Sequence, residues 1–493
     1  MRDNITNRSG VFSPGKRWRL FRAMIHKNRF PRLADVGLIL AVALSFAVPA
    51  SAAWKEKVLY SFQGGTNDGS YPYGSVIFDK QGNLYGVLQD FGGDSCAPLG
   101  GECGAVYRLS PPAQKGGSWT ETLLYEFQGK GANDGESPNS GLIMDKSGNL
   151  YGLTAYGGTG NCTLLGLSAG CGTVYKLSPP KQKGGAWTET ILYSFPSATQ
   201  GYVPIGDLVF DSAGNLYGST LFGGTKGTTC DPDYGGQCGV VFELSPPKKQ
   251  GGAWTQKVLH NFAGIASGKQ DGDGAEPNGG LVLDNKGAIY GTSYYGGNEG
   301  GSCGSVGCGT VFKLAPPTKN GGAWTQKALH VFKGIPDGVR PAAGVVFGPK
   351  GSLYGTTVLG GGGNYPSGTA FELIPGVNGS WTERIAHSFQ DGDDGSEPKS
   401  ALLADASGNL YGSALGGGGG QRYGVVFRLR PPKVQTKPWT LTTLYAFPGS
   451  PDGAAPAAPI VSDASGNLWS TTTGGGTGGC VYGGCGTVFE VKP

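Results

Sequence analysis

A tryptophan begins each of seven similar units that together occupy most of the chain. These residues are Trp54, Trp119, Trp187, Trp254, Trp324, Trp381 and Trp439. Each tryptophan opens a run of β-prone residues that ends at a phenylalanine, as from Trp187 to Phe195. Repetition at such a spacing is typical of folds built from one repeated supersecondary unit, and it overrides the multi-domain estimate that 493 residues would otherwise give.

Each unit contains sequence for four short strands. After Phe127, a D-G-x-x-P turn at 134–138 precedes a hairpin whose strands we expect at 141–145 and 149–154. A glycine-rich loop, a third strand at 172–177, and a Pro-Pro and Gly-Gly connection then lead to the next tryptophan strand. Four short strands repeated seven times predict an all-β protein that forms a single seven-bladed β-propeller of four-stranded blades.

The two ends of the repeat indicate how the ring closes. The repeat begins with an extra tryptophan strand, 54–62, and its last unit stops after a third strand, 486–491. We expect the N-terminal strand to complete the last blade, which leaves no broad open edge. A solenoid of stacked hairpins is the alternative, but it would need distinct capping units, and neither end of the repeat has one.

Residues 1–53 have the pattern of an export signal. A basic stretch that ends at Arg32 is followed by an apolar run, 36–48, and by the small residues A-S-A at 50–52. This order is typical of a secretory signal peptide, here with an extended basic N-terminus. We therefore expect the propeller, residues 54–493, to be exported to the periplasm, the cell surface or the exterior. No later segment has the roughly 20 apolar residues of a spanning helix, so we expect no membrane span after cleavage.

The charge of the chain argues against nucleic acid as a partner. The whole chain has a formal net charge of +4, but residues 1–53 hold nine Lys/Arg and two Asp. The chain has 39 basic and 35 acidic residues, so without residues 1–53 it keeps 30 basic and 33 acidic residues and a net charge of −3. The predicted mature protein therefore lacks the basic surface that nucleic-acid binding requires.

Strand direction assigns the connections to two faces of the propeller. Antiparallel neighbours place the D-x-x-G-N hairpins and the Pro-Pro connections on one face, and the D-G-x-x-P turns and glycine-rich loops on the other. The second set varies widely in length, so we expect binding on that face, at the mouth of the central channel.

The position just after the turn proline begins the innermost strand and differs between units. In order, it holds Tyr73, Asn139, Ile205, Asn278, Ala342, Lys399 and Ala457. The candidate binding residues are the polar and aromatic members of this position, with the neighbouring arginine: Tyr73, Asn139, Asn278, Lys399 and Arg340. Such a mixture suits a polar ligand such as a glycan, and a solvated rim without a ligand is the alternative.

All ten cysteines lie in the glycine-rich loops, two in each of five loops. The pairs are Cys96 and Cys103, Cys162 and Cys171, Cys230 and Cys238, Cys303 and Cys308, and Cys480 and Cys485. In an exported protein such neighbours indicate local disulfide bonds. Zinc binding is the alternative, but matching histidines or further ligands are missing from the loops, so we expect no metal site.

Residues that usually carry catalysis are scarce. Beyond the leader, His260, His330 and His387 occupy one repeat position at which the other units have tyrosine, which favours packing or hydrogen bonding over catalysis. The aspartate of the D-x-x-G-N motif recurs in six units, which indicates a turn that every blade needs. The acidic turns 271–273 and 391–394 resemble calcium loops only superficially, because the remaining ligands of an EF-hand are absent. We therefore assign no catalytic residue and no cofactor.

The motifs resemble those of a known family. The sequences N-L-Y-G at Asn149 and G-T-V-Y-K-L at Gly172, with the D-G-x-x-P turn, resemble the GloVer (Gloeo/Verruco) tandem repeat of bacterial exported proteins over residues 54–493. The order of hairpin and strands is similar, more loosely, to NHL-type propellers. The resemblance implies no activity for any particular residue.

Three classes of function stay open. We expect an exported, non-enzymatic repeat protein of the envelope or exterior that binds a glycan or a protein through its loop-rich face. The alternatives are a polysaccharide lyase or hydrolase that uses channel carboxylates, a quinone-dependent dehydrogenase, and a structural role without a ligand.

Overall fold

The structure is a computed structural model that describes the propeller part of the chain. The described residues are 54–65, 68–91, 103–164, 167–225, 230, 237–249, 251–265, 272–297, 303–319, 321–362, 366–420, 422–434, 436–480 and 483–493. The chain divides into two units, Met1–Ser51 and Ala52–Pro493. The leader predicted for residues 1–53 lies outside the described residues and stays a prediction. In the part that is described, no helix has the length and apolar character needed to cross a membrane.

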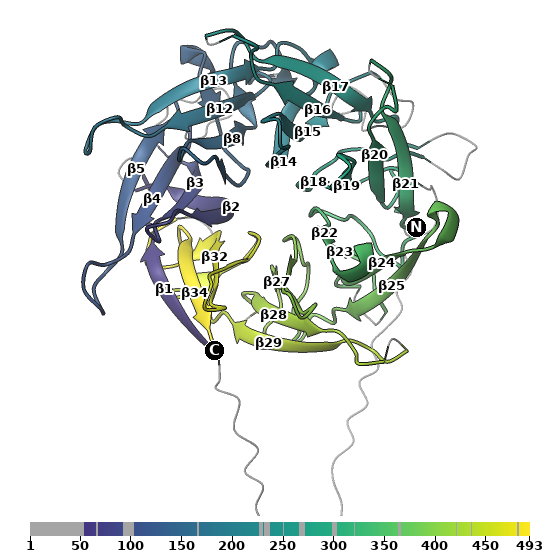
Figure 1. The fold of residues 1–493 in the computed structure, drawn as a ribbon. Coiled ribbons are helices and arrows are strands. Elements are labelled where there is room, and N and C mark those ends of the chain that lie inside the picture. The colour runs from purple at the N-terminus through teal and green to yellow at the C-terminus, as the bar shows by residue number, and fades with distance from the viewer. Residues whose placement is uncertain are drawn as a thin grey trace, which may run out of the picture. The chain divides into compact units, whose positions relative to one another are not determined.

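Seven four-stranded antiparallel sheets form the second unit and surround a central opening (Figure 1). The first three, named from the inside outward, are β2 (Ser70–Phe78), β3 (Leu84–Asp90), β4 (Ala105–Ser110) and β5 (Thr120–Glu126); β7 (Ile143–Met144), β8 (Leu150–Thr154), β12 (Thr173–Ser178) and β13 (Thr188–Ser194); and β14 (Tyr202–Phe210), β15 (Leu216–Phe222), β16 (Val240–Ser245) and β17 (Thr255–Asn261). The next three are β18 (Val282–Leu283), β19 (Ile289–Ser293), β20 (Thr310–Ala315) and β21 (Thr325–Val331); β22 (Val346–Phe347), β23 (Leu353–Thr357), β24 (Thr369–Pro375) and β25 (Trp381–Ser388); and β26 (Leu403–Ala404), β27 (Leu410–Ala414), β28 (Val425–Arg430) and β29 (Thr440–Ala446).

The seventh sheet joins the two ends of the repeat. It contains β31 (Val461–Ser462), β32 (Leu468–Thr472), β34 (Thr487–Lys492) and, outermost, β1 (Lys55–Ser61). Strand β1 runs antiparallel to β34, with Lys55 opposite Lys492 and Ser61 opposite Thr487. The predicted seven-bladed propeller, closed by the N-terminal strand in the last blade, is therefore confirmed.

Aspartates close the tight hairpins between the two inner strands. Asp145 accepts hydrogen bonds from the backbone N–H of Ser147 and Asn149 at 2.8 and 3.0 Å, from the Asn149 side chain at 2.7 Å, and from the Tyr151 hydroxyl at 3.0 Å. Gly148 has a φ of 81°, the left-handed conformation that the turn requires. Partial burial pushes the pKa of Asp145 upward, but these hydrogen bonds outweigh it and hold the pKa below its ordinary value. The turn interpretation of this aspartate is confirmed.

A ring of aromatic pairs forms the core between neighbouring blades. The phenylalanine that ends each outermost strand is at most 1% exposed, and it packs edge-on against an aromatic ring of the next blade with centroids 5.0 to 5.3 Å apart. The pairs are Phe62–Tyr107, Phe127–Tyr175, Phe195–Phe242, Phe262–Phe312, Phe332–Phe371, Phe389–Phe427 and Phe447–Phe489. Edge-on pairs stabilise beyond their buried area, so the same contact holds every blade to the next.

The histidines of the outermost strands have a structural role. His387 forms a hydrogen bond through Nε2 to Asp394 at 2.8 Å, and in another blade the Tyr125 hydroxyl donates to Asp134 at 2.8 Å. Both bonds tie the end of an outermost strand to the D-G turn that follows it. Histidine and tyrosine are thus interchangeable donors, which confirms the hydrogen-bonding interpretation of this position.

Candidate functional site

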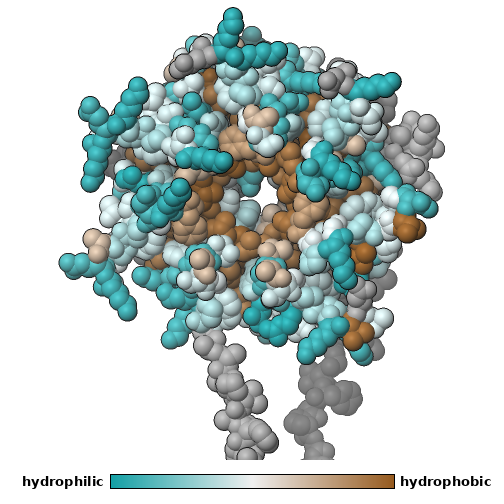
Figure 2. Space-filling view, in the orientation of Figure 1, coloured by the Kyte–Doolittle hydropathy of each residue, from teal (hydrophilic) through white to brown (hydrophobic). Residues whose placement is uncertain are grey.

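A cavity of about 270 Å³ lies at the centre of the ring, and we call it the central cavity. Every blade contributes to its lining the residue that follows the turn proline: Tyr73, Asn139, Ile205, Asn278, Ala342, Lys399 and Ala457. Four of the five predicted binding residues therefore meet in one place, and Arg340 is not among the lining residues. Figure 2 shows an opening at the centre of the ring, bordered largely by hydrophobic residues, with hydrophilic side chains gathered toward the periphery.

A left-handed residue before each turn proline positions these side chains. The seven residues are Tyr71, Ser137, Val203, Glu276, Arg340, Glu397 and Ala455, with φ between 53° and 61°. Each backbone N–H is satisfied by the glycine-rich loop of the preceding blade; for example, Arg340 N donates to Cys308 O at 2.8 Å and Ala455 N to Tyr423 O at 2.8 Å. Such a conformation is uncommon for residues other than glycine, and the hydrogen bond to the neighbouring blade holds it in place.

Disulfide bonds fix several of the loops that supply these carbonyl groups, whereas the loops of Ser367 and Tyr423 contain no cysteine. The described pairs have Cα–Cα distances of 4.8 to 5.2 Å, within the usual range for a disulfide: Cys162–Cys171, Cys230–Cys238, Cys303–Cys308 and Cys480–Cys485. These four predicted pairs are confirmed, and they indicate an oxidising compartment. Cys96 lies outside the described residues, so its pairing with Cys103 stays a prediction.

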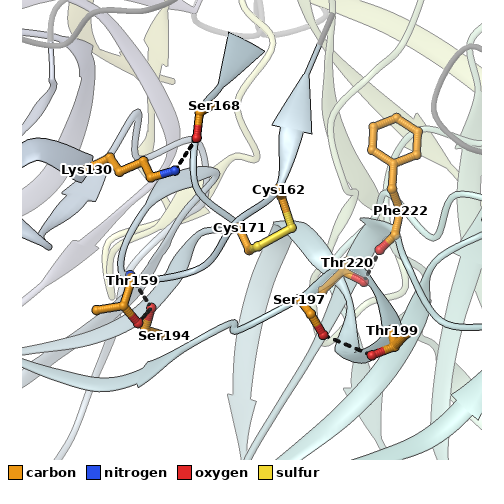
Figure 3. The surroundings of a disulfide bond; sticks show 10 residues. All are labelled: Lys130, Thr159, Cys162, Ser168, Cys171, Ser194, Ser197, Thr199, Thr220 and Phe222. Carbon is orange, nitrogen blue, oxygen red and sulfur yellow. Dashed lines mark hydrogen bonds between the residues drawn. A yellow bond between two sulfur atoms is a disulfide. The ribbon is translucent and has the colours of Figure 1, made fainter. Parts of the chain in front are cut away.

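The two kinds of variable connection lie together on one face, as strand direction predicts. Figure 3 shows the Cys162–Cys171 bridge beside Lys130, whose amino group donates to the Ser168 hydroxyl. Lys130 belongs to the turn after β5, and Ser168 to the glycine-rich loop of the next blade. A backbone contact between the two kinds of connection spans the closing blade, where Tyr71 N donates to Cys485 O, in the glycine-rich loop of the preceding blade, at 3.0 Å.

A carboxyl group that the sequence analysis did not single out also lines the central cavity. Asp207 lies two residues after Ile205 on β14, where the other units have small residues or proline. Its Oδ1 accepts a hydrogen bond from Gly141 N at 2.6 Å, and a Cβ on Gly141 would lie only 2.7 Å from that oxygen. Burial raises the pKa of Asp207, and the Gly141 N–H only partly opposes this.

The polar side chains of the cavity leave hydrogen-bonding capacity for a ligand. Lys399 pairs with Glu397 at 3.1 Å, but the two side chains are 38% and 45% exposed, so water screens the pair. Asn139 Oδ1 is buried and has no hydrogen-bond partner among the described residues. The Tyr73 side chain is also partly exposed, at 38%.

The rest of the lining is small and apolar. Leu281, Val282, Val345 and Val346 belong to the lining, together with several glycines. An apolar wall with a few convergent polar groups is typical of small-ligand sites. Of the described residues that line the cavity, Asp207 alone carries a carboxyl group, whereas glycoside hydrolysis usually requires two.

Arg340 lies over aromatic rings of the neighbouring blade. Its guanidinium carbon is 5.7 Å from the centre of the Tyr294 ring and 5.4 Å from that of Tyr295. The two rings pack edge-on with centroids 4.8 Å apart. Cation–π contacts of this kind orient the arginine side chain, so its place outside the cavity lining has a physical cause.

Solved structures with low sequence identity are similar over most of their length. An enzyme of carbohydrate-active family AA12 from Trichoderma reesei, in a calcium structure, is 12% identical, with a TM-score of 0.40 over 90% of this chain and 96% of that chain. A putative oxidoreductase (glucose dehydrogenase) from Thermus thermophilus is 13% identical, with a TM-score of 0.37 over 89% and 100%. PhoX from Pseudomonas fluorescens, in complex with vanadate, is 11% identical, with a TM-score of 0.41 over 90% and 95%. These similarities are too distant to carry an argument.

The sequence comparison is more informative. No curated protein matches the chain. The model of the Gloeobacter/Verrucomicrobia repeat, however, matches residues 46–300, 162–374 and 300–493, which together contain all seven blades. The chain therefore belongs to the Gloeobacter/Verrucomicrobia repeat family, as its motifs predict.

Proposed function

We propose that this protein is an exported, non-enzymatic binding propeller whose central cavity holds a polar ligand, and that a glycan is the class of ligand that fits it best. The observation that carries the proposal is the convergence of Tyr73, Asn139, Asn278 and Lys399 on one cavity, at a repeat position that differs between blades. A side chain that differs from its repeat equivalents, at a position where the fold requires no particular residue, indicates a role in binding a specific ligand.

The composition of the cavity supports a sugar. Amide, ammonium and phenol groups match the hydroxyl groups of a pyranose, and the apolar wall of Leu281 and Val345 matches its C–H faces. A volume of about 270 Å³ lies just below the usual range of ligand pockets, about 300 to 1,000 Å³, so one sugar unit fits better than a longer chain.

The test begins with a glycan array probed with residues 54–493, followed by calorimetry with the best ligand. Lys399→Ala removes a charged donor and is expected to weaken binding about 10- to 100-fold, and Asn278→Ala about 3- to 10-fold. Lys183→Ala is the matched control, because Lys183 is exposed in a Pro-Pro connection on the other face. Arg340→Ala is expected to have a smaller effect than Lys399→Ala, because Arg340 does not line the cavity.

Binding that both Lys399→Ala and Asn278→Ala leave unchanged would remove the central cavity as the site. Export has a separate test, since mass spectrometry of secreted material is expected to find an N-terminus close to Trp54. A mature N-terminus at Met1 would contradict export through a cleaved leader.

A further inference from the structure

Two departures from the repeat meet between the sheet β22–β25 and the neighbouring sheet β26–β29, the fifth and sixth sheets in chain order. The hairpin between β22 and β23 has Gly348 where the other units have the turn aspartate. The connection between β24 and β25 lacks the Pro-Pro pair and is built around the short turn Val377–Gly379. Both segments lie on the hairpin face, opposite the variable loops.

The missing aspartate changes the partners of Tyr354, the tyrosine that recurs at this position in most blades. In the other blades with this tyrosine, its hydroxyl donates to the turn aspartate, as Tyr411 does to Asp405 at 3.2 Å. Tyr354 instead donates to Glu372 Oε1 at 3.0 Å, and the other oxygen of Glu372 pairs with Arg384. Glu372 is therefore engaged by two donors, although it is only 6% exposed.

A second cavity, of about 280 Å³, lies at this place, and we call it the side cavity. Its walls include the prolines Pro349, Pro375, Pro431 and Pro432, none of which has a backbone N–H. Trp439, the first residue of the neighbouring blade's tryptophan motif, also lines it. Four of its eleven described lining residues therefore offer no backbone donor to an occupant.

The indole of Trp439 has an unused donor. Trp439 is 6% exposed, and its buried Nε1–H has no hydrogen-bond partner among the described residues. Its ring packs edge-on against Tyr354 at 5.6 Å and lies 5.9 Å from the Arg384 guanidinium carbon. The tryptophans that begin the other six units are only half-buried, so this environment is particular to one blade. Buried donors are normally paired, and an orphaned one calls for an explanation such as a missing acceptor.

The charges that line the side cavity favour an anion. Lys350 and Arg384 are cationic, and Glu372 is the single carboxylate among the described residues that line it. Because Arg384 neutralises Glu372, the exposed ammonium group of Lys350 remains without a counter-charge in the cavity. An acceptor group that carries a negative charge would satisfy both Lys350 and the Trp439 N–H.

We propose that the side cavity is a second binding site, which takes a small carboxylate on a five- or six-membered ring, the class that contains the uronic acids. The carboxylate accepts hydrogen bonds from Trp439 Nε1 and Lys350 Nζ, and the ring of the ligand packs against the proline walls. This site is independent of the central cavity, because it lies on the other face and shares none of its lining residues.

The test is calorimetry of residues 54–493 with methyl glucuronide, and with methyl glucoside as the neutral ligand of the same shape. We expect the glucuronide to bind and the glucoside to bind at least about tenfold more weakly. Trp439→Phe keeps the ring and removes the donor, and Lys350→Ala removes the charge; each is expected to weaken glucuronide binding at least about tenfold.

Matched controls come from the repeat itself. Trp187→Phe and Lys286→Ala change the same repeat positions in other blades and are expected to leave glucuronide binding unchanged, as is Lys399→Ala in the central cavity. Lys350 is exposed, so its substitution tests the proposal even if Trp439→Phe fails to fold. Equal binding of the two sugars, no binding of either, or equal losses with Lys350→Ala and Lys286→Ala would overturn the proposal.

Discussion

Four glutamates of the outermost strands make the stability of the propeller depend on pH. Glu121 of β5 is half-buried near Asp68, in the turn that follows β1. Burial, and then the charge of Asp68, raises the pKa of Glu121 from 4.5 to about 7. Burial and a neighbouring aspartate likewise raise the pKa of Glu189 and Glu383 to about 7 and that of Glu56 to about 8.

Two other blades show what this strand position does. There the residue is glutamine: Gln256 Nε2 donates to Gln200 O at 3.3 Å, and Gln326 Nε2 donates to Asp273 O at 3.1 Å. Glu121 Oε1 is buried without a hydrogen-bond partner among the described residues. A protonated carboxyl group can donate to the neighbouring turn as an amide does, whereas an ionised one cannot and is repelled by the aspartate.

Glu121→Gln is the substitution that isolates this effect. A rise of the pKa from 4.5 to about 7 corresponds to about 3 kcal/mol of lost stability once the carboxyl is ionised, which we reduce to about 1 kcal/mol because water screens a half-exposed group. The contribution of a raised pKa is fully present below pH 4.5 and is lost as the pH rises through about 7. The variant is therefore expected to be about 1 kcal/mol more stable than the parent at pH 8 and equal to it at pH 4.5.

Urea unfolding of residues 54–493 at both pH values measures the difference. Glu126→Gln is the matched control, because Glu126 lies on the same strand but is exposed, and it is expected to change neither value. Gln326→Glu places a carboxyl group at the equivalent position of another blade and is expected to lower stability at pH 8 only. A stabilisation by Glu121→Gln that is the same at both pH values, or a Gln326→Glu variant without pH dependence, would refute the reasoning.

Two further predictions concern the closure of the ring and the loops. Phe62→Ala is expected to lower the free energy of unfolding in urea by about 3 to 5 kcal/mol, because Phe62 is fully buried between the closing blade and the first; a loss below about 1 kcal/mol would show that closure contributes little. Replacing Cys162 and Cys171, nine residues apart, by alanine is expected to cost about 2.6 kcal/mol, and the five-residue pair Cys303 and Cys308 about 2.1 kcal/mol. Unfolding of each double variant against the oxidised parent checks this. Unchanged stability would contradict the entropy argument, because it would mean that strain in the closed native loop offsets the entropy removed from the unfolded chain.

The fold was predictable because the same sequence pattern recurs in every blade. In every unit, the tryptophan and the phenylalanine mark the two ends of the outermost strand. The last blade lacks this strand, so the extra strand at 54–62 pairs with β34. The position after the turn proline was predictable for the same reason. The residues after the turn prolines lie before or within the innermost strands at the same end of the ring, so they come together, as the lining of the central cavity confirms. The strand itself begins before this position in β2 and β14 and after it in the other five blades.

Asp207 lines the central cavity, but a comparison of the single position after the turn proline could not identify it. Side chains at i and i+2 of a strand share a face, so the position two residues beyond Ile205 faces the channel as well. That position holds small residues or proline in the other blades, and an aspartate among them was a visible departure from the repeat. The strand period, applied to the whole innermost strand, would have found the carboxyl group.

The side cavity follows from contacts that no single repeat contains. Gly348 is visible in the sequence as the unit without a turn aspartate, but the effect of that change falls on Trp439, 91 positions later and in the neighbouring blade. Without a turn aspartate, Tyr354 donates its hydroxyl hydrogen bond to Glu372. Glu372 also pairs with Arg384, whose guanidinium group lies over the Trp439 indole. Because a propeller packs each sheet against the next, a substitution in one hairpin is felt across the interface rather than within its own unit. Departures from a repeat therefore locate candidate sites best when each is traced to the blade that it contacts.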